Sequence, residues 1–380
     1  MHYDLAVVGA GIVGLAHALA AAERGLRVVV IDRDAQANGA SIRNFGLVVV
    51  SGQEPGLSRQ RAERSREVWL RLAGEVGIGI LHRGKLVAAQ RPEALALLEA
   101  FKAGPHGQDC RLLTRAESVD YLPGLNGSRI IGGLHSPYEL RVESREALPK
   151  LAAFLAEHHG VEFRRGVAVS GVTPPVVETS HGPVRAAKII VCPGDDLATL
   201  FPDRIAQYGV QRCKLQMLRL ADPGFRFRSA LVSDLSLLRY GGYAALPEAT
   251  ALRNRLTEDC PLALDNGVHL IVVQSADGSL VVGDSHHYGQ TPDPFASDEV
   301  DGLILQEFAT LFGCAPPVLA RWTGTYASAA KAGFIDAPHE DVRVVMVTSG
   351  TGASTGFAIG EETIAELMGE RNVARSAFAR

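Results

Sequence analysis

A short glycine-rich segment near the start of the chain, VVGAGIVGLAHA, constrains the fold more than any other feature. It places Gly9, Gly11 and Gly14 in the spacing G-x-G-x-x-G. An apolar run at 3–9 precedes the last two glycines, and apolar residues with helical spacing follow at 12–24. The spacing alone is a weak signal, but between a strand and a helix it is typical of the βαβ unit that binds a dinucleotide.

The three glycines have separate physical uses in such a unit. Gly9 permits the tight turn, Gly11 lets the backbone approach the pyrophosphate, and Gly14 lets the helix pack close to the strand. The first helical turn then faces the phosphates with free N–H groups and a positive dipole end. A glycine-rich turn without a ligand is the alternative. We expect the nucleotide to be bound by Gly9, Ala10, Gly11, Ile12, Val13 and Gly14.

A second buried strand is expected at 28–31, after Gly25 as a helix stop. Asp32 ends this strand and Arg33 follows it. A carboxylate at this position can accept hydrogen bonds from both hydroxyls of an adenosine ribose. We therefore expect Asp32 and Arg33 to contact the nucleotide.

Composition limits the kind of protein and the kind of partner. Hydrophobic residues make up 47% of the chain and charged residues 21%, which is typical of a globular protein. The net charge of −4 gives no global attraction to nucleic acid or to an anionic membrane. No apolar run approaches the roughly 20 residues that span a bilayer, and no signal peptide precedes the first strand, so we predict a cytoplasmic protein. The five cysteines have no C-x-x-C spacing, which predicts neither a disulfide framework nor a metal site.

Local patterns along the chain predict two interleaved domains. Helical spacing occurs at 62–76 and 91–103, a Gly/Pro-rich turn region at 122–138, and a long helix is expected at 140–158. From about 210 onward the pattern changes to strands and turns, which favours an antiparallel sheet. We predict a nucleotide-binding domain made of 1–80, 145–210 and 325–380, and a substrate domain made of 81–144 and 211–324.

Several motifs together identify a family that the nucleotide motif cannot identify alone. GASIRNFG follows the second strand, GVAVSGV and KIIVCPG lie in the middle, and SGTGASTG lies near the C-terminus. With these motifs the sequence resembles the D-amino-acid oxidase (DAO) family of FAD-dependent oxidoreductases over nearly the whole chain. The resemblance implies an α/β fold, in which a Rossmann-type FAD-binding domain is interleaved with an α+β substrate domain that has a largely antiparallel sheet.

The resemblance also implies which further residues hold FAD. The loop with Ser41, Arg43 and Asn44 would run beneath the flavin, and Val169 would touch the adenine. Family members that bind flavin covalently use a cysteine near the position of Gly324; the last cysteine here is Cys314, so noncovalent FAD is expected. A helix N-terminus beside the flavin pyrimidine would stabilise the negative charge of the reduced ring. The remaining matches are Gly194, Gly350, Thr351, Gly352 and Ala353.

A narrower resemblance concerns the substrate. ASIRNFG, SPYELRVESREAL, CKLQMLRL, QSADGSLVVGDSHHYG and TSGTGASTGF are similar to a subgroup of the family associated with bacterial phosphonate breakdown. This implies a small anionic amine, such as N-methyl-2-aminoethylphosphonate, oxidised to an aldehyde and an amine with oxygen as the acceptor.

Candidate catalytic residues follow from the same placement. Arg43 would lie beneath the flavin, where a cation helps the reduced flavin or a substrate anion; a salt bridge within its loop is the alternative. His286 and His287 follow a strand, so one can point inward and the other outward. They can equally form a structural pair, whereas a metal site lacks a third ligand.

Tyr326 stands where amino-acid-oxidising relatives have an arginine for the substrate carboxylate, and Val281 stands where sarcosine oxidases have an oxygen-activating lysine. Lys214 or His286 is the expected substitute cation for the oxygen step. Weaker candidates on the sheet, each of which can equally be a solvated strand residue, are Lys214, Gln216, Arg239 and Tyr240.

Three other functions stay open at this point. One is a glycine- or sarcosine-like amino acid oxidase, and the second is a dehydrogenase that passes electrons to another acceptor. The third is a flavin-bearing subunit without enzymatic activity. The sequence predicts no oligomeric state.

Overall fold

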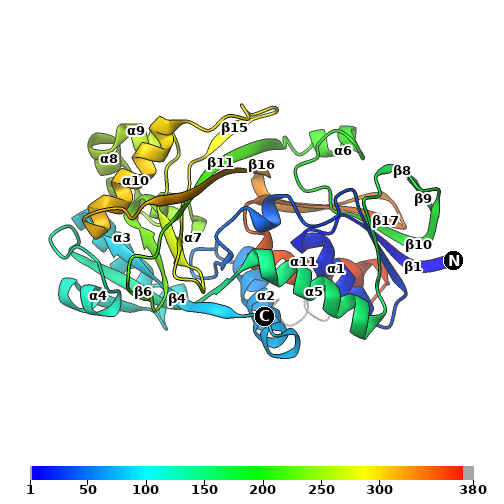
Figure 1. Ribbon diagram of the computed structural model, residues 1–380, viewed down its shortest axis with the longest axis horizontal. Helices are drawn as coiled ribbons and strands as arrows, with labels where there is room; N and C mark the ends of the chain where they lie inside the picture. The colour runs from blue at the N-terminus through cyan, green and yellow to red at the C-terminus, as the bar shows by residue number, and fades with distance from the viewer. Residues whose placement is uncertain (1, 371–380) are drawn as a thin grey trace.

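A five-stranded parallel sheet organises one half of the molecule in the computed structural model, which describes residues 2–370 (Figure 1). The central strand β1 (His2–Val8) pairs with β2 (Val28–Asp32) on one side and β10 (Val184–Val191) on the other. β2 also pairs with β7 (Glu162–Arg165), and β10 pairs with β17 (Val342–Ser349). β1, β2 and β10 are mostly apolar because both faces of this part of the sheet are covered, whereas β7 has the polar sequence EFRR.

Helices cover one face of the parallel sheet. α1 (Ile12–Ala22) packs against α5 (Ser144–His159) and α11 (Gly352–Leu367), and α11 also packs against α2 (Leu57–Val76). Figure 1 shows α1, α5 and α11 lying together beside the sheet. The first βα turn, with the three glycines, therefore joins the end of β1 to α1, as the Rossmann-type unit requires.

A second sheet fills the other half and is antiparallel except for the pairing of β12 with β4. The helices that pack around it include α3 (Pro92–Ala103), α8 (Ala249–Asp259) and α10 (Asp298–Phe312). Its strands are β11 (Gln211–Leu220), β14 (Leu280–Gly283), β15 (His287–Gly289), β13 (Ile271–Gln274), β12 (Ala230–Ser233), β4 (Ile80–Ala89), β6 (Gly132–Val142), β5 (Arg111–Thr114) and β3 (Leu47–Val48).

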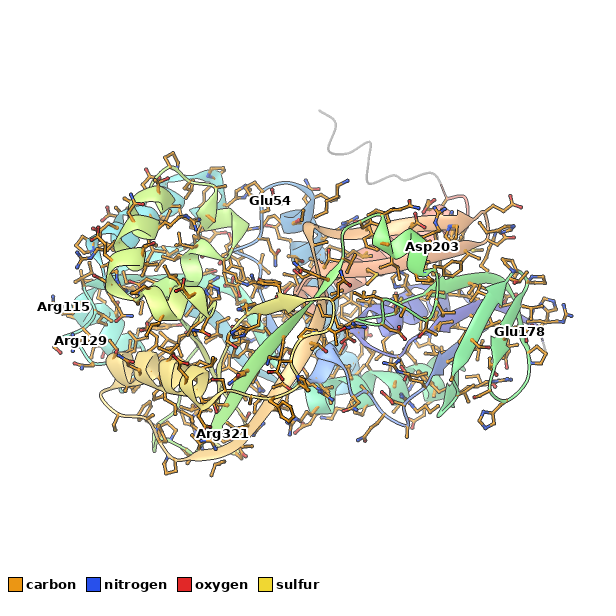
Figure 2. The ribbon with its side chains drawn as sticks, turned by 90° about the horizontal axis from the view of Figure 1, so that it is seen from above. Glu54, Arg115, Arg129, Glu178, Asp203 and Arg321 are labelled. Atoms are coloured by element: carbon orange, nitrogen blue, oxygen red, sulfur yellow. The ribbon has the colours of Figure 1, made fainter. Side chains whose placement is uncertain are left out.

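One long strand, β16 (Val318–His339), belongs to both sheets. Its first half pairs with β11, where Tyr326 lies opposite Cys213, and its second half pairs with β17. Figure 1 shows β16 crossing from one half of the molecule to the other. Figure 2 shows the two far ends, marked by Arg115 in α4 (Arg115–Tyr121) and by Glu178 in the β8–β9 hairpin (Val169–Thr173 and Val176–Thr179).

The predicted fold class is confirmed, but one part of the sequence interpretation is wrong. The expected turn region at 122–138 ends in strand β6, and the helix begins at Ser144 rather than at residue 140. Gly124 and Gly127 do lie in turns, but Gly132 and Gly133 are buried strand residues: a Cβ on Gly132 would lie 2.9 Å from the Leu113 carbonyl oxygen, and one on Gly133 would lie 2.6 Å from that of Val87. Close approach of neighbouring strands, not a turn, is what requires glycine here. The exact domain boundaries stay a prediction.

Of the described helices, none combines the length and the apolar character that crossing a membrane requires.

Candidate active site

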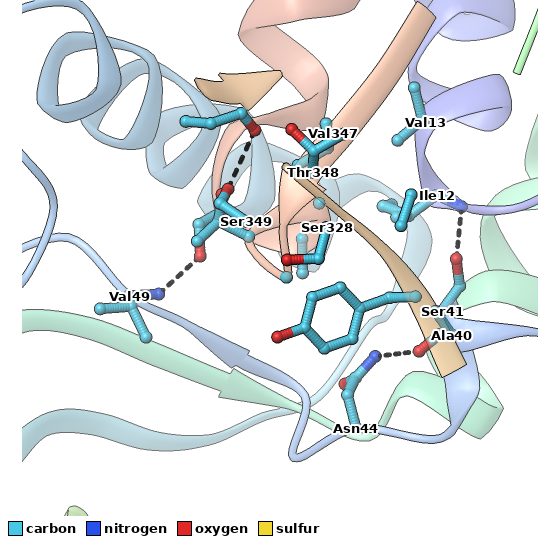
Figure 3. A pocket seen from close by; sticks show the side chains of 18 of the residues that line it. Ile12, Val13, Ala40, Ser41, Asn44, Val49, Ser328, Val347, Thr348 and Ser349 are labelled. Carbon is cyan, nitrogen blue, oxygen red and sulfur yellow. Dashed lines mark hydrogen bonds between the residues drawn. The ribbon is translucent and has the colours of Figure 1, made fainter. Parts of the chain in front are cut away.

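A cavity of about 450 Å³ lies where the two halves meet. Its base is formed by the N-termini of α1 and α11 and by the loop that follows β2, and its far wall by residues 239–241, 269–271 and 284–286. The first half of β16 runs along it. Figure 3 shows residues of the base, including Ile12, Val13, Ser41, Asn44 and Ser349.

Glycine is required at two positions of the first βα turn. Gly9 has φ +103°, and a Cβ there would lie 2.4 Å from the Cys192 carbonyl oxygen. A Cβ on Gly14 would lie 1.9 Å from the carbonyl oxygen of Gly9. A Cβ on Gly11 would meet only the Ser41 hydroxyl, at 3.0 Å, so Gly11 presents bare backbone to the cavity.

The loop after β2 is attached to the helix N-terminus and to β16. The Ile12 N–H donates to the Ser41 hydroxyl at 3.0 Å, which is drawn in Figure 3. The guanidinium of Arg43 donates to the Thr323 carbonyl at 3.2 Å and to the Asn38 side chain at 3.1 Å. Its partners are thus a carbonyl and an amide oxygen, so the expected alternative of a salt bridge within the loop is not the arrangement seen. Asn44 donates to the Ala40 carbonyl at 2.7 Å.

The N-terminus of α11 lies beside that of α1. Gly350 has φ +72°, Thr351 is the N-cap, and a Cβ on Gly352 would lie 3.4 Å from a methyl group of Ile12. Ala353 also lines the cavity. Two helix N-termini therefore point toward one space, which favours negative charge there.

Arg239 dominates the far wall. Its guanidinium donates to the hydroxyl of Tyr288 at 2.8 Å and also to that of Tyr326. Burial raises the pKa of Tyr326 above its ordinary value, and Arg239 lowers it by less. Both hydrogen-bond partners are phenols rather than carboxylates, so the positive charge stays available to an anionic ligand.

Asp284 and His286 lie on the same wall of the cavity as Arg239. Asp284 is 7% exposed, and burial raises its pKa to about 7, while Arg239 acts in the opposite direction. The His286 Nε2 lies 3.6 Å from an Asp284 carboxyl oxygen, and its Nδ1 lies 2.9 Å from the Gly267 carbonyl. Burial and then Arg239 hold the pKa of His286 well below its ordinary value, and the same two causes lower the pKa of His269 to about 3. At neutral pH both rings are uncharged, so this wall combines one fixed cation with one titratable carboxyl group.

The family follows from comparison with known proteins. A family model described as "FAD dependent oxidoreductase" (DAO) matches residues 4–366. The chain belongs to the DAO family of FAD-dependent oxidoreductases.

Individual relatives are more distant. The chain is 28% identical over 241 residues to the bifunctional protein ThiO/ThiG of Nostoc sp., a segment that is 59% of this chain and 35% of that protein. It is 28% identical over 165 residues to a glycine oxidase of Geobacillus kaustophilus, or 40% and 42% of the two chains. The aligned segments thus span less than half of these curated relatives. The crystal structure of glycine oxidase from Bacillus cereus superposes with a TM-score of 0.78 at 18% identity and covers 97% of this chain and 96% of that one, which shows a shared fold.

The base of the cavity in this DAO-family protein fits FAD. Bare backbone at Gly11 leaves room for a pyrophosphate, and Asp32 ends β2 with its carboxylate accepting the Ala10 N–H at 2.6 Å and the Asp34 N–H at 2.8 Å. Among the predicted FAD residues, those that line the cavity are Gly11, Ile12, Val13, Gly14, Ser41, Arg43, Asn44, Gly194, Gly350, Thr351, Gly352 and Ala353.

The other predicted FAD residues lie around the cavity rather than in its lining. Gly9 and Ala10 form the turn behind Gly11. Arg33 forms an ion pair with Asp196 at 3.1 Å, and Val169 is a buried residue of β8. The assignment of each residue to FAD stays a prediction.

The structure does not bring all predicted catalytic residues together. Arg43, Arg239, His286 and Tyr326 line the cavity, as does Tyr240. Lys214 and His287 are cross-strand partners of β11 and β15 that are not part of the lining. The Lys214 ammonium donates to the Phe295 carbonyl at 2.7 Å, and the His287 ring contacts the Asn266 side chain at 3.1 Å.

Strand alternation explains these misplaced candidates. Leu215 lines the cavity, so Lys214 and Gln216 point to the opposite face of β11. Gln216 donates to the Ser297 carbonyl at 3.0 Å and to Asp301 at 2.8 Å. We therefore leave Lys214, Gln216 and His287 out of the candidate site.

Sequence reasoning missed Asp284 and His269 as cavity residues. Asp284 ends the predicted strand SLVVGD and lies two positions before His286. A carboxylate at a strand end beside candidate histidines could therefore have indicated a site residue. His269 offers no such signal, because it precedes a short apolar run and reaches the cavity only through the pairing of β13 with β14.

Proposed function

We propose that this protein uses noncovalent FAD to oxidise a small anionic amine, and that its substrate is an aminoalkylphosphonate such as N-methyl-2-aminoethylphosphonate. The observation that carries the proposal is Arg239, a cavity-lining cation that two phenols hold and to which, among residues 2–370, no carboxylate is hydrogen-bonded. An anion bound there would sit on the wall opposite the two helix N-termini.

The chemistry divides between cofactor and protein. When bound, FAD accepts a hydride from the carbon next to the amine nitrogen. Water then adds to the imine and releases aldehyde and amine, while oxygen takes the two electrons and leaves as hydrogen peroxide. The protein's own part is to exclude water, hold the anion and aim the reacting C–H bond.

A small set of residues would hold the cofactor. The backbone at Gly11 and the first turn of α1 would bind the pyrophosphate, and Asp32 the ribose. The α11 N-terminus at Gly352 would lie at the flavin. Cys192 is the one cysteine in the lining, and burial raises its thiol pKa far above the ordinary value, which disfavours a reactive thiolate. Acid or heat should therefore release all flavin from the polypeptide, and flavin left on the denatured chain would contradict this.

The geometry of the anion site supports a phosphonate. A phosphonate presents three oxygens as a tripod, which suits donors that converge from several directions. Arg239 and Tyr326 reach the cavity from two different elements, the segment after η3 and β16. Arg43 lines the cavity from the opposite side.

One observation favours a second candidate, a glycine- or sarcosine-like amino acid oxidase. Tyr326 stands where amino-acid-oxidising relatives have the arginine that binds a carboxylate. Arg239, however, brings a guanidinium to the Tyr326 hydroxyl from another element. The planar Arg239 guanidinium can therefore bind a carboxylate with two parallel hydrogen bonds. In addition, two relatives carry the names glycine oxidase and ThiO/ThiG.

Anaerobic reduction of the flavin by matched substrates separates the two functions. The set is N-methyl-2-aminoethylphosphonate, sarcosine and N-methyl-β-alanine, each with wild type, Arg239→Met and Arg43→Met. We expect wild type to prefer the phosphonate. Arg239→Met should lower catalytic efficiency for it by roughly ten- to a hundredfold, the loss of a charge-assisted bond of about 1.5 to 3 kcal/mol.

Arg43→Met is the matched comparison, because the Arg43 guanidinium is already engaged by Thr323 and Asn38. Its effect should be smaller than that of Arg239→Met. A wild-type preference for either carboxylate would replace the phosphonate assignment with the amino acid oxidase.

A further inference from the structure

Asp284 is a buried carboxyl group that the proposed anion site does not use. It follows directly after β14 and lines the cavity on the same wall as Arg239. We propose that Asp284 is a catalytic residue that binds the ammonium group of the substrate and takes its proton. This inference rests on the proposed function, since it assigns a role in amine oxidation.

The carboxyl group has free hydrogen-bonding capacity that points into the cavity. The residue is 7% exposed, and among residues 2–370 no other side chain donates a hydrogen bond to it. The His286 Nε2 lies 3.6 Å from the carboxyl group, which is beyond hydrogen-bond distance. A buried carboxylate without donors is costly, so a cationic ligand that donates N–H bonds would satisfy it.

The charged and titratable groups that surround Asp284 include one cation. Arg239 faces it from the segment after η3 (Asp234–Leu238), and Tyr240 follows Arg239 in the chain. From β11, Cys213 faces it. His286 and His269 complete the set, and burial holds both rings neutral. With Arg239 positive and Asp284 negative, the wall matches the two charges of an aminoalkylphosphonate zwitterion.

Proton removal is a necessary step, because a protonated amine has no lone pair to assist loss of hydride from its α-carbon. The N–H bond of the ammonium breaks, its electron pair stays on nitrogen, and an O–H bond forms on Asp284. A base is most effective when its pKa lies near the working pH. The Asp284 pKa of about 7 meets this requirement.

His286 is suited to a positioning role rather than to the role of base. Its Nδ1 faces the Gly267 carbonyl, which can only accept, so Nδ1 carries the ring hydrogen. The Nε2 lone pair therefore faces Asp284 at 3.6 Å, and it would accept a hydrogen bond from the protonated carboxyl group if the two groups moved closer together. This arrangement orients the carboxyl group without adding a charge.

The main experiment compares Asp284→Asn with wild type by anaerobic stopped-flow reduction of the flavin between pH 5.5 and 9.5. The matched control is Asp265→Asn, which removes a carboxylate from an exposed position at the end of α9 (Pro261–Asp265). In wild type, flavin reduction at low substrate should rise with pH through about 7, as Asp284 ionises. Asp284→Asn should be about a hundredfold slower at pH 7, and its profile should follow the pKa of the free amine. Asp265→Asn should behave as wild type.

Binding provides a readout that does not depend on turnover. Two inert ligands, 2-hydroxyethylphosphonate and 2-(trimethylammonio)ethylphosphonate, are titrated by the change in the flavin spectrum. Asp284→Asn should weaken binding of 2-(trimethylammonio)ethylphosphonate about tenfold and leave binding of 2-hydroxyethylphosphonate unchanged. Equal weakening of both ligands would show general damage to the site and overturn the assignment.

A test on wild type alone covers the case in which Asp284→Asn loses its flavin. Two substrates that differ by fluorination next to the amine have very different amine pKa values. If Asp284 takes the proton, the acid limb of the pH profile stays near pH 7 for both substrates. If the acid limb moves with the amine pKa, the inference is wrong.

A wild-type flavin that no amine reduces would overturn the proposed function and this inference together, whereas reduction that Asp284→Asn leaves unchanged would overturn only the inference.

Discussion

Two pairs of oppositely charged residues lie near Tyr240, and they differ in the hydrogen bonds that the carboxylate accepts. Lys85 and Glu139, with N to O 3.4 Å, are 1% and 0% exposed and lie outside the cavity lining. Arg239 and Asp284 lie in the lining. Tyr240 is close to both pairs, since the Lys85 ammonium is 5.5 Å from its ring centre and its own pKa responds to Asp284 and Glu139.

Hydrogen bonds decide the difference between the two carboxylates. One oxygen of Glu139 accepts the Ser51 N–H at 2.9 Å, the Ser51 hydroxyl at 2.7 Å and the Val50 N–H at 3.3 Å. Burial alone would raise the pKa of Glu139, but Lys85 and these serine contacts hold it below the ordinary value. Asp284 has an opposite charge nearby, but no side chain among residues 2–370 donates to it. Burial raises its pKa to about 7, and Arg239 and its own backbone N–H oppose this by less. Both carboxylates have a cation nearby, so the hydrogen-bond donors make the difference. The carboxylate of Glu139 is satisfied within the scaffold, whereas that of Asp284 is open to a ligand.

The largest expected effect comes from breaking the scaffold pair. Lys85→Met should lower the free energy of unfolding by about 3 to 5 kcal/mol, because it leaves a buried carboxylate without its cation. Urea denaturation at pH 7 measures this. The double variant Lys85→Met with Glu139→Leu removes both charges and should recover most of the loss. If the double variant is no more stable than Lys85→Met, the buried charge is not the cause.

The cavity pair should respond with the opposite sign. The Asp284 pKa is about 7 in the folded protein against an ordinary value of 3.8. Folding therefore favours the protonated form, which contributes stability below about pH 4 that is lost as the pH rises through 7. Asp284→Asn removes this pH-dependent loss and should be more stable than wild type at pH 8.5 by up to about 4 kcal/mol, with little difference at pH 4. Unfolding free energies at both pH values test this, and a variant that is less stable at pH 8.5 would contradict it.

The same contrast shows which parts of the site a sequence can predict. The base of the cavity was predictable because Gly9, Gly11 and Gly14 lie in one local motif that can be recognised from adjacent residues. Asp284 and Arg239 are 45 positions apart and meet through the order and register of β11 to β14. No local pattern encodes that meeting. Alternation along β11 shows that Lys214 and Leu215 point to opposite faces, but it does not show which face lines the cavity. That choice depends on the register of β11 against β16.

The smallest expected effect concerns oxygen and Lys214. A cation next to the reduced flavin would stabilise the first, superoxide-like product of oxygen reduction, so neutralising it should slow reoxidation more than reduction. Lys214 was the sequence-based candidate, together with His286. The Lys214 ammonium, however, is bound to the Phe295 carbonyl outside the cavity lining, and burial keeps the His286 ring neutral. Arg239 and Arg43 both line the cavity, and Arg239 is the one on the wall with His286.

We therefore expect Lys214→Met to change both half-reactions by less than about twofold, as a variant outside the site should. Arg239→Met should slow reoxidation of the reduced, substrate-free enzyme, where its role in anion binding has no influence. Stopped-flow mixing of photoreduced protein with oxygen measures this step directly, with Arg219→Met, which removes a guanidinium bound to Ser279 outside the cavity lining, as the matched control. If Lys214→Met slows reoxidation and Arg239→Met does not, a charge outside the cavity controls the oxygen step, and the distinction drawn between cavity and scaffold charges fails for this reaction.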